Sequence, residues 1–192
     1  SCQSDLVGKI WKERPSLPGE KVFLLDEKYS GESTASKLQR VREKMKGASA
    51  DVHLLASLDD IAWLLNLRGN DIAYCPLFLS YLLVYEDHAE LFADEKKFPD
   101  DVLKELEKNH ILLKPYNSIY DAVHVLDSSI RIMLDPDRVN YTLYHSIPQG
   151  VSVLEHENPE ILMKSVKNDI EIVNIQEAHL KDAVAHTKFM YW

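Results

Sequence analysis

The stretch that decides the fold class is VHLLASLDDIAWLLNLRGND, residues 52–71. Its first five residues form a short, largely apolar run, which is typical of a buried β-strand. Ser57 then stands at a helix N-cap position, and Asp59 and Asp60 fall in the first turn, where the helix dipole favours carboxylates. We therefore predict a buried strand at 52–56 that leads directly into a short helix.

The same alternation of strand and helix continues on both sides of this stretch. Two apolar runs separated by Glu86 and Asp87 predict a hairpin, and Gly47 is the predicted C-cap of the helix before residue 52. Alternating strands and helices indicate an α/β domain, and a hairpin makes its sheet mixed. We predict a mixed β-sheet flanked by helices, with strands at 81–85, 88–92, 111–114, 130–134 and 151–154, and helices at 33–46, 99–108, 118–126, 139–145, 159–166 and from 169 onward.

The composition restricts the partners of the chain. Its 192 residues include 45% hydrophobic residues, enough for a buried core, and its formal net charge is −9. A surface that binds nucleic acid or an anionic membrane needs an excess of Lys and Arg, so neither partner is expected. No apolar run approaches the roughly 20 residues that span a bilayer. Cys2 and Cys75 form no C-x-x-C pair and are expected to be reduced and unpaired in a cytoplasmic protein.

The distribution of turn residues predicts three parts. Residues 1–31 contain most of the early Pro and Gly residues and are predicted to be an irregular lead-in. Residues 32–166 carry the α/β pattern, and a polar break at Lys167, Asn168 and Asp169 precedes a long amphipathic helix. We expect this helix, 167–192, to belong to a further domain, because its apolar stripe lacks a partner in the preceding sequence.

The sequence contains one possible set of metal ligands. His179, Asp182 and His186 share one face of the predicted last helix, and three such side chains could hold a cation. The H-E-x-x-H pattern is absent, however, and no further acidic ligand can be assigned. We favour the interpretation that these residues flank the apolar stripe of the helix.

The loop after residue 66 is the candidate binding segment. Arg68, Asn70 and Asp71 stand beside a glycine, and Tyr74 and other aromatic residues follow closely. Polar groups and aromatic rings on a loop often bind a ligand. The alternative is an ordinary loop in which Arg68 pairs with Asp71. The residues themselves leave both interpretations open.

Three blocks of the sequence resemble a known family. SLDDIAWLLNLRGNDIAYCPLFLSYLLV, residues 57–84, is similar to the hallmark stretch of the cytosolic three-domain Xaa-Pro aminopeptidases, in the creatinase/prolidase ("pita-bread") superfamily. IWKERPSLP, residues 10–18, resembles the linker between the first and second domains of that family. Residues 167–192 resemble the opening helix of its catalytic domain. The order and spacing of the blocks fit the family along essentially the whole chain.

The resemblance implies that the chain is a non-catalytic middle domain of a larger metallopeptidase. The whole enzyme would remove the N-terminal residue from peptides with proline in second position, using two divalent metal ions, typically manganese. Its ligands, two Asp, one His and two Glu, would lie beyond Trp192, so no catalytic or metal-binding residue is assigned to this chain. The creatinase-type domain would shape the substrate cleft or support a homodimer.

The resemblance also places the candidate loop near substrate. The loop that carries Arg68 corresponds in position to one that approaches the cleft in the family, so Arg68, Asn70, Asp71 and Tyr74 are the candidate cleft residues. The expected partners are a peptide substrate and the catalytic domain that is absent here. Two alternatives stay open: a creatinase-like or prolidase-like relative with another substrate, and an inactive binding module of the same fold.

Overall fold

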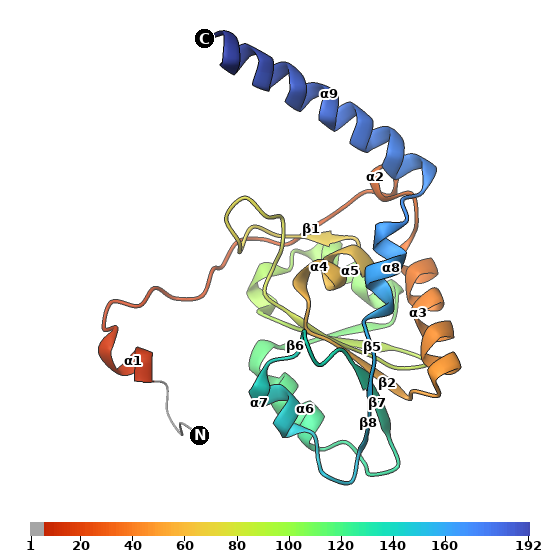
Figure 1. Ribbon diagram of the computed structural model, residues 1–192. Helices are drawn as coiled ribbons and strands as arrows, with labels where there is room; N and C mark the ends of the chain where they lie inside the picture. The colour runs from red at the N-terminus through yellow and green to blue at the C-terminus, as the bar shows by residue number, and fades with distance from the viewer. Residues whose placement is uncertain (1–5) are drawn as a thin grey trace.

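The computed structural model describes residues 6–192, and its core is a mixed β-sheet. Within this range the sheet has six strands in the order β6-β5-β4-β2-β7-β8 (Figure 1). A separate two-stranded sheet pairs β1 with β3. The strands are β1 (Phe23–Leu24), β2 (Val52–Leu55), β3 (Leu67–Arg68), β4 (Tyr81–Val84), β5 (Ala89–Ala93), β6 (Ile111–Pro115), β7 (Arg131–Leu134) and β8 (Ser152–Glu155).

Parallel and antiparallel pairs both occur, as the sequence predicts. β4 and β5 form the predicted antiparallel hairpin, with Leu82 opposite Leu91, and β2 pairs antiparallel with β4. The pairs β2–β7, β7–β8 and β5–β6 are parallel. The helices are α1 (Leu6–Ile10), α2 (Glu27–Ser30), α3 (Thr34–Ala48), α4 (Leu58–Leu64), α5 (Asp100–Lys108), α6 (Ile119–His124), α7 (Tyr141–Ser146), α8 (Pro159–Ser165) and α9 (Asp169–Tyr191).

Each face of the sheet has its own apolar core, because successive strand residues point to opposite sides. Leu55 and Leu82 join the core covered by α3, α4, α5 and α8. Their neighbours Leu54 and Leu83 join the core covered by α6 and α7. The fold therefore has three layers, and the central strands β2, β4 and β5 are largely buried on both sides.

The end of α3 differs from the prediction that Gly47 caps it. Gly47 lies inside the helix, and Ser49 is the C-cap, in the left-handed conformation with φ of 58°. Its N–H donates to the carbonyl oxygens of Met45 and Lys46. Met45 and Ala48 pack against the core and keep the last turn helical past the glycine, so tertiary packing overrides the local stop signal.

The segment predicted to be an irregular lead-in contains regular structure. α1, β1 and α2 all lie in it, and Val22 is fully buried in the core. Val22 N–H donates to the Lys97 carbonyl, and Leu25 N–H donates to the Asn66 carbonyl. The part of the segment from residue 22 onward is therefore packed against the α/β core. Cys2 lies outside the described residues, and Cys75 is a free, exposed thiol.

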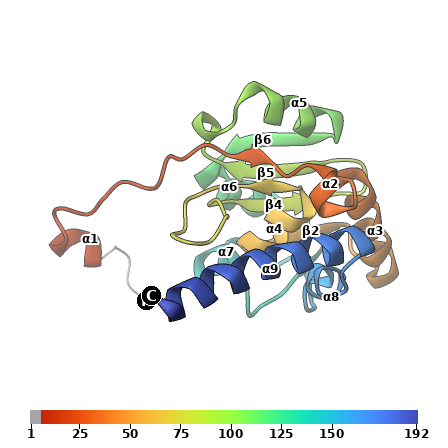
Figure 2. The ribbon, with the colours of Figure 1, turned by 90° about the horizontal axis from the view of Figure 1, so that it is seen from above.

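The last helix extends away from the body of the molecule. α9 begins beside α2 and continues beyond the sheet (Figures 1 and 2). Asn168 is its N-cap, as predicted, and forms a reciprocal capping box with Glu171. None of the helices formed by residues 6–192 has the length and apolar character that a membrane crossing requires.

Candidate functional site

The candidate loop begins at β3, and Arg68 is folded back on α4. Its side chain is half-buried, and its Nη1 atom donates to the carbonyl oxygens of Ala62 (2.6 Å) and Leu67 (2.9 Å). The Ala62 carbonyl lies in the last turn of α4, where a cation is favoured by the helix dipole. Burial lowers the pKa of Arg68, and the charge of Glu171 opposes this effect. Guanidinium groups stay charged well above neutral pH, so Arg68 brings a positive charge to the base of the loop.

Asp71 has a structural partner other than Arg68. Its carboxylate is fully buried and forms an ion pair of 2.6 Å with the Nζ atom of Lys97, which is itself buried. The same carboxylate oxygen accepts a hydrogen bond of 2.7 Å from the Leu79 backbone N–H. The interpretation in which Arg68 pairs with Asp71 is therefore wrong. The Ala62 and Leu67 carbonyls hold Arg68, and Asp71 ties the loop to the segment before α5.

Asn70 and Tyr74 lie on the solvent side of the loop. Tyr74 is fully exposed and adopts φ of 63°, a strained conformation for a bulky residue. It sits in a tight turn in which the Cys75 N–H donates to the Ile72 carbonyl. The structure thus divides the predicted set: Asn70 and Tyr74 face solvent, Arg68 lies at the base, and Asp71 is buried.

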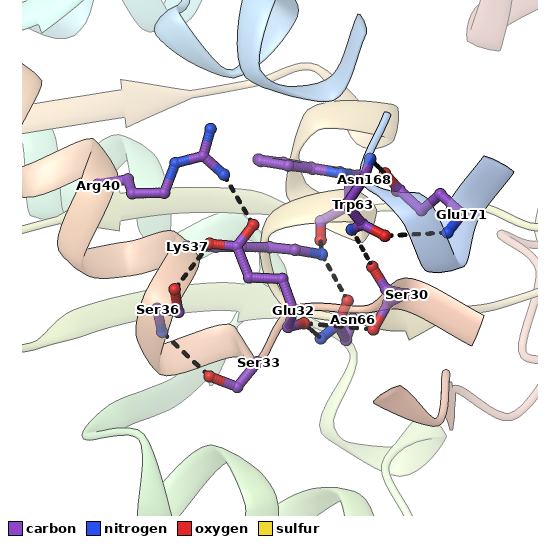
Figure 3. Close-up of polar contacts among 10 residues, drawn as sticks. All are labelled: Ser30, Glu32, Ser33, Ser36, Lys37, Arg40, Trp63, Asn66, Asn168 and Glu171. Carbon is purple, nitrogen blue, oxygen red and sulfur yellow. Dashed lines mark hydrogen bonds and ion pairs between the residues drawn. The ribbon is translucent and has the colours of Figure 1, made fainter. Parts of the chain in front are cut away.

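A buried lysine lies directly behind the loop, and sequence reasoning missed it. Lys37 on α3 is only 1% exposed, and its Nζ atom donates to the Trp63 carbonyl (2.8 Å) and to Asn66 Oδ1 (2.7 Å) (Figure 3). The ammonium also lies 4.5 Å from the centre of the Trp63 ring. Burial lowers the pKa of Lys37 to about 8, against the charges of Glu171 and Glu32. Lys37 lies four residues before Val41, on the apolar face of α3, and this spacing could have indicated from the sequence that the lysine is buried.

A second buried ionisable pair joins β2 to α8. His53 and Glu160 are both fully buried, and His53 Nε2 lies 3.2 Å from Glu160 Oε2. The other ring nitrogen, Nδ1, lies 3.1 Å from the Met133 carbonyl oxygen. Both ring nitrogens therefore face oxygen atoms, and this geometry needs one proton more than a neutral imidazole beside a carboxylate can provide.

The possible metal ligands of the last helix are exposed. His179, Asp182 and His186 all lie on α9 and are exposed to solvent. Among residues 6–192, no group of three or more His, Cys, Asp and Glu side chains is placed to hold a metal ion. The described part of the chain therefore presents a candidate binding loop with a polar anchor behind it.

Comparison with known proteins identifies the family. The model of the creatinase/prolidase N-terminal domain matches residues 13–171. The chain belongs to this family. The chain is 39% identical over 182 residues to Xaa-Pro aminopeptidase 1 of Dictyostelium discoideum, and the alignment covers 94% of this chain and 28% of that protein. It is 34% identical to a probable Xaa-Pro aminopeptidase P of Neurospora crassa, covering 100% of this chain and 30% of that one.

Solved structures agree with the assignment to the creatinase/prolidase N-terminal domain family. The X-prolyl aminopeptidase of Caenorhabditis elegans, described as a cytosolic enzyme with a di-nuclear active site, superposes with a TM-score of 0.92 at 31% identity, over 98% of this chain and 32% of that one. An Xaa-Pro dipeptidase of Bacillus anthracis shares the fold, with a TM-score of 0.61 at 15% identity over 83% of this chain and 44% of that one. The chain spans less than a third of the length of its aminopeptidase relatives.

Proposed function

We propose that this chain is a non-catalytic accessory domain of a metal-dependent Xaa-Pro aminopeptidase. Such an enzyme removes the N-terminal residue from peptides that have proline in second position. The observation that carries the proposal is the superposition of 98% of this chain on the C. elegans X-prolyl aminopeptidase with a TM-score of 0.92. A match of this quality at 31% identity covers the candidate loop and the start of α9 as well as the core of the fold.

We propose that the chain divides into three parts. Residues 32–166 form the creatinase-type domain, and the preceding segment, 1–31, links it to an earlier domain and packs on it from residue 22. Residues 167–192 form the first helix of the catalytic domain. The exposed apolar side chains of α9 support this assignment, because a helix of the catalytic domain would bury them.

The residues that the structure describes, 6–192, do not fit a di-nuclear metal centre. No suitable group of ligands exists within residues 6–192, so the metal ions, manganese in our proposal, would be held by the rest of the protein. We propose that this domain contributes to the peptide-binding cleft through the loop with Arg68, Asn70, Asp71 and Tyr74. Arg68 would supply charge, Asn70 and Tyr74 exposed contacts, and Asp71 the anchor. The protein would act in the cytoplasm as a homodimer.

The test compares the whole protein with this chain. Both are incubated with Mn²⁺ and with two tripeptides that differ only in proline or alanine at the second position. We expect the whole protein to release the N-terminal residue from the proline peptide alone, and we expect no release by the 192-residue chain. Equal cleavage of both peptides would indicate a relative with another specificity. No cleavage by the metal-loaded whole protein would favour an inactive binding module.

A further inference from the structure

We propose that Lys37 and Asn66 are positioning residues that couple the start of α9 to β3, the strand that carries Arg68. The coupling is a property of this chain. Any effect of this coupling on enzyme turnover would rest on the proposed function, but the coupling itself does not. Figure 3 shows the cluster in which the turn before α3, the end of α4 and the start of α9 meet around the Lys37 ammonium.

Asn66 sets the direction in which the chain leaves α4. It is buried and has a left-handed backbone conformation, with φ of 51°. Its side chain accepts from Lys37 and donates to the Glu32 carbonyl oxygen (2.8 Å), and its own carbonyl accepts from Leu25 N–H. Leu67 and Arg68 follow at once as β3. Because these polar contacts hold Asn66 in an uncommon conformation, they also determine where Arg68 begins.

The Glu32 turn carries the connection to α9. Ser30 Oγ donates to the Glu32 carbonyl, and the Ser30 carbonyl accepts a hydrogen bond of 2.8 Å from Asn168 Nδ2. Gly31 lies between them with φ of 67°, and a Cβ atom there would overlap the Asn168 side chain. Only glycine allows this approach, so the α9 N-cap fits closely against the same turn that Asn66 holds from the other side.

Charge links the two ends of the cluster. Glu171, the capping-box partner of Asn168, is the strongest of the charges that oppose the lowering of the pKa of Lys37 by burial, and it also opposes the lowering of the pKa of Arg68. The charged groups that face Lys37 are Glu171 from α9, Glu32 from the turn before α3, Arg68 from β3 and Arg40 from α3 itself. Displacement of α9 would move the negative charge of Glu171 away from both Lys37 and Arg68, and this is a physical route for coupling.

The test measures the orientation of α9 directly. In a Cys2→Ser background, spin labels are attached to the exposed Cys75 of the candidate loop and to Gln176→Cys on α9, and double electron–electron resonance gives their distance distribution. We expect one narrow distribution for the parent. Lys37→Met, which keeps an apolar stem, should raise the population of displaced orientations by about 2- to 30-fold, the range that coupling residues produce. Lys44→Met, an exposed lysine of the same helix, is the matched control and should change nothing.

A double variant separates coupling from local damage. Asn168→Ala removes the hydrogen bond from the α9 N-cap to the Ser30 carbonyl, and it should also broaden the distance distribution. If Lys37 and Asn168 act through one network, the double variant broadens it no more than the stronger single variant. Additive broadening, or an unchanged distribution in folded Lys37→Met, would overturn the proposal.

A pH titration of the parent tests the proposal without any change at Lys37. The distribution should broaden as pH rises with a midpoint of about 8, the pKa of Lys37. In a Trp11→Phe, Trp192→Phe background, the emission of Trp63 should change with the same midpoint, because the ring loses its cation. If emission titrates while the distance distribution stays constant, the lysine loses its proton without moving α9, and the proposal is wrong. These measurements need no peptidase activity, so their failure is distinct from failure of the proposed function.

Discussion

At the residue scale, the buried pair of Asp71 and Lys97 decides whether the candidate loop keeps its shape. Lys97→Met should destabilise the chain by about 3–5 kcal/mol, because it leaves the Asp71 carboxylate buried without its partner. Urea denaturation measures the loss. Lys96→Met, the exposed neighbour, serves as the control and should stay near the parent.

The double variant Asp71→Asn, Lys97→Met shows whether the charge is the cause. Asparagine keeps an acceptor for the Leu79 N–H and removes the buried negative charge. We expect the double variant to be more stable than Lys97→Met alone, as a double-mutant cycle would register. A double variant that is less stable would show that packing of the lysine stem matters more than its charge.

At the scale of elements, the His53–Glu160 pair ties α8 to the sheet in a pH-dependent way. Burial alone disfavours the imidazolium, but Glu160, the Met133 carbonyl and Asp60 together outweigh it and raise the pKa of His53. Folding therefore retains a proton that the unfolded chain releases near its ordinary pKa of about 6.5. The stability from this pair should be fully present below that pH and be lost as pH rises through the higher folded value.

Urea unfolding between pH 5.5 and 8.5, a window of about three units around the ordinary histidine pKa, measures this dependence. The free energy of unfolding should fall with rising pH in the parent, and the fall should be smaller in Glu160→Gln, which removes the charge that favours the imidazolium. His179→Gln, on exposed α9, should keep the slope of the parent. A slope that is the same in Glu160→Gln would assign the pH dependence to other groups.

The α9 helix has no buried residue, and its apolar side chains are largely uncovered. Ile172, Leu180, Val184 and Phe189 are 42–66% exposed, and burial of such side chains is worth roughly 1.5–3 kcal/mol each. We expect α9 to mediate self-association at high concentration, where a second copy can cover the stripe. Sedimentation and thermal melting of the chain and of a version ending at Val166 measure this.

The shorter chain should be monomeric and should melt near the temperature of the parent. The described contacts of α9 with the rest of the molecule lie near the start of the helix, such as the hydrogen bond from Asn174 to the Lys28 carbonyl. If the shorter chain instead loses most of its stability and keeps the oligomeric state of the parent, α9 belongs to this domain and the proposed boundary at residue 166 is wrong.

At the scale of the whole molecule, we expect Arg68 to connect this domain to catalysis. In the full-length protein, Arg68→Ala should lower kcat/KM for an Xaa-Pro peptide by about 10- to 100-fold, the effect of losing one charge-assisted hydrogen bond. The melting temperature should stay close to that of the parent, because Arg68 is half-buried and contacts backbone carbonyls only at its Nη1 atom. Arg138→Ala, on another exposed loop, is the control, and equal kinetics in the two variants would make Arg68 a structural residue.

Local sequence patterns predicted the order of most elements from α3 onward and several of their ends. Short apolar runs between turn residues located β2, β4, β5 and β7, and the polar break at residues 167–169 located the start of α9. These features are local, because a strand or a cap is specified by residues within a few positions of each other. The three similar blocks of sequence also identified the family, which the comparisons confirm.

Only the tertiary structure decided which polar residues meet. Lys37 contacts a residue 29 positions away, Lys97 one 26 positions away and His53 one 107 positions away. No local pattern specifies such pairs, because each depends on how separate elements pack and on which buried charge finds a partner. For the same reason the sequence left open whether Asp71 pairs with Arg68, its near neighbour, whereas the fold brings Lys97 to it. Packing also moved the end of α3 from Gly47 to Ser49, because the buried stripe continues past the glycine.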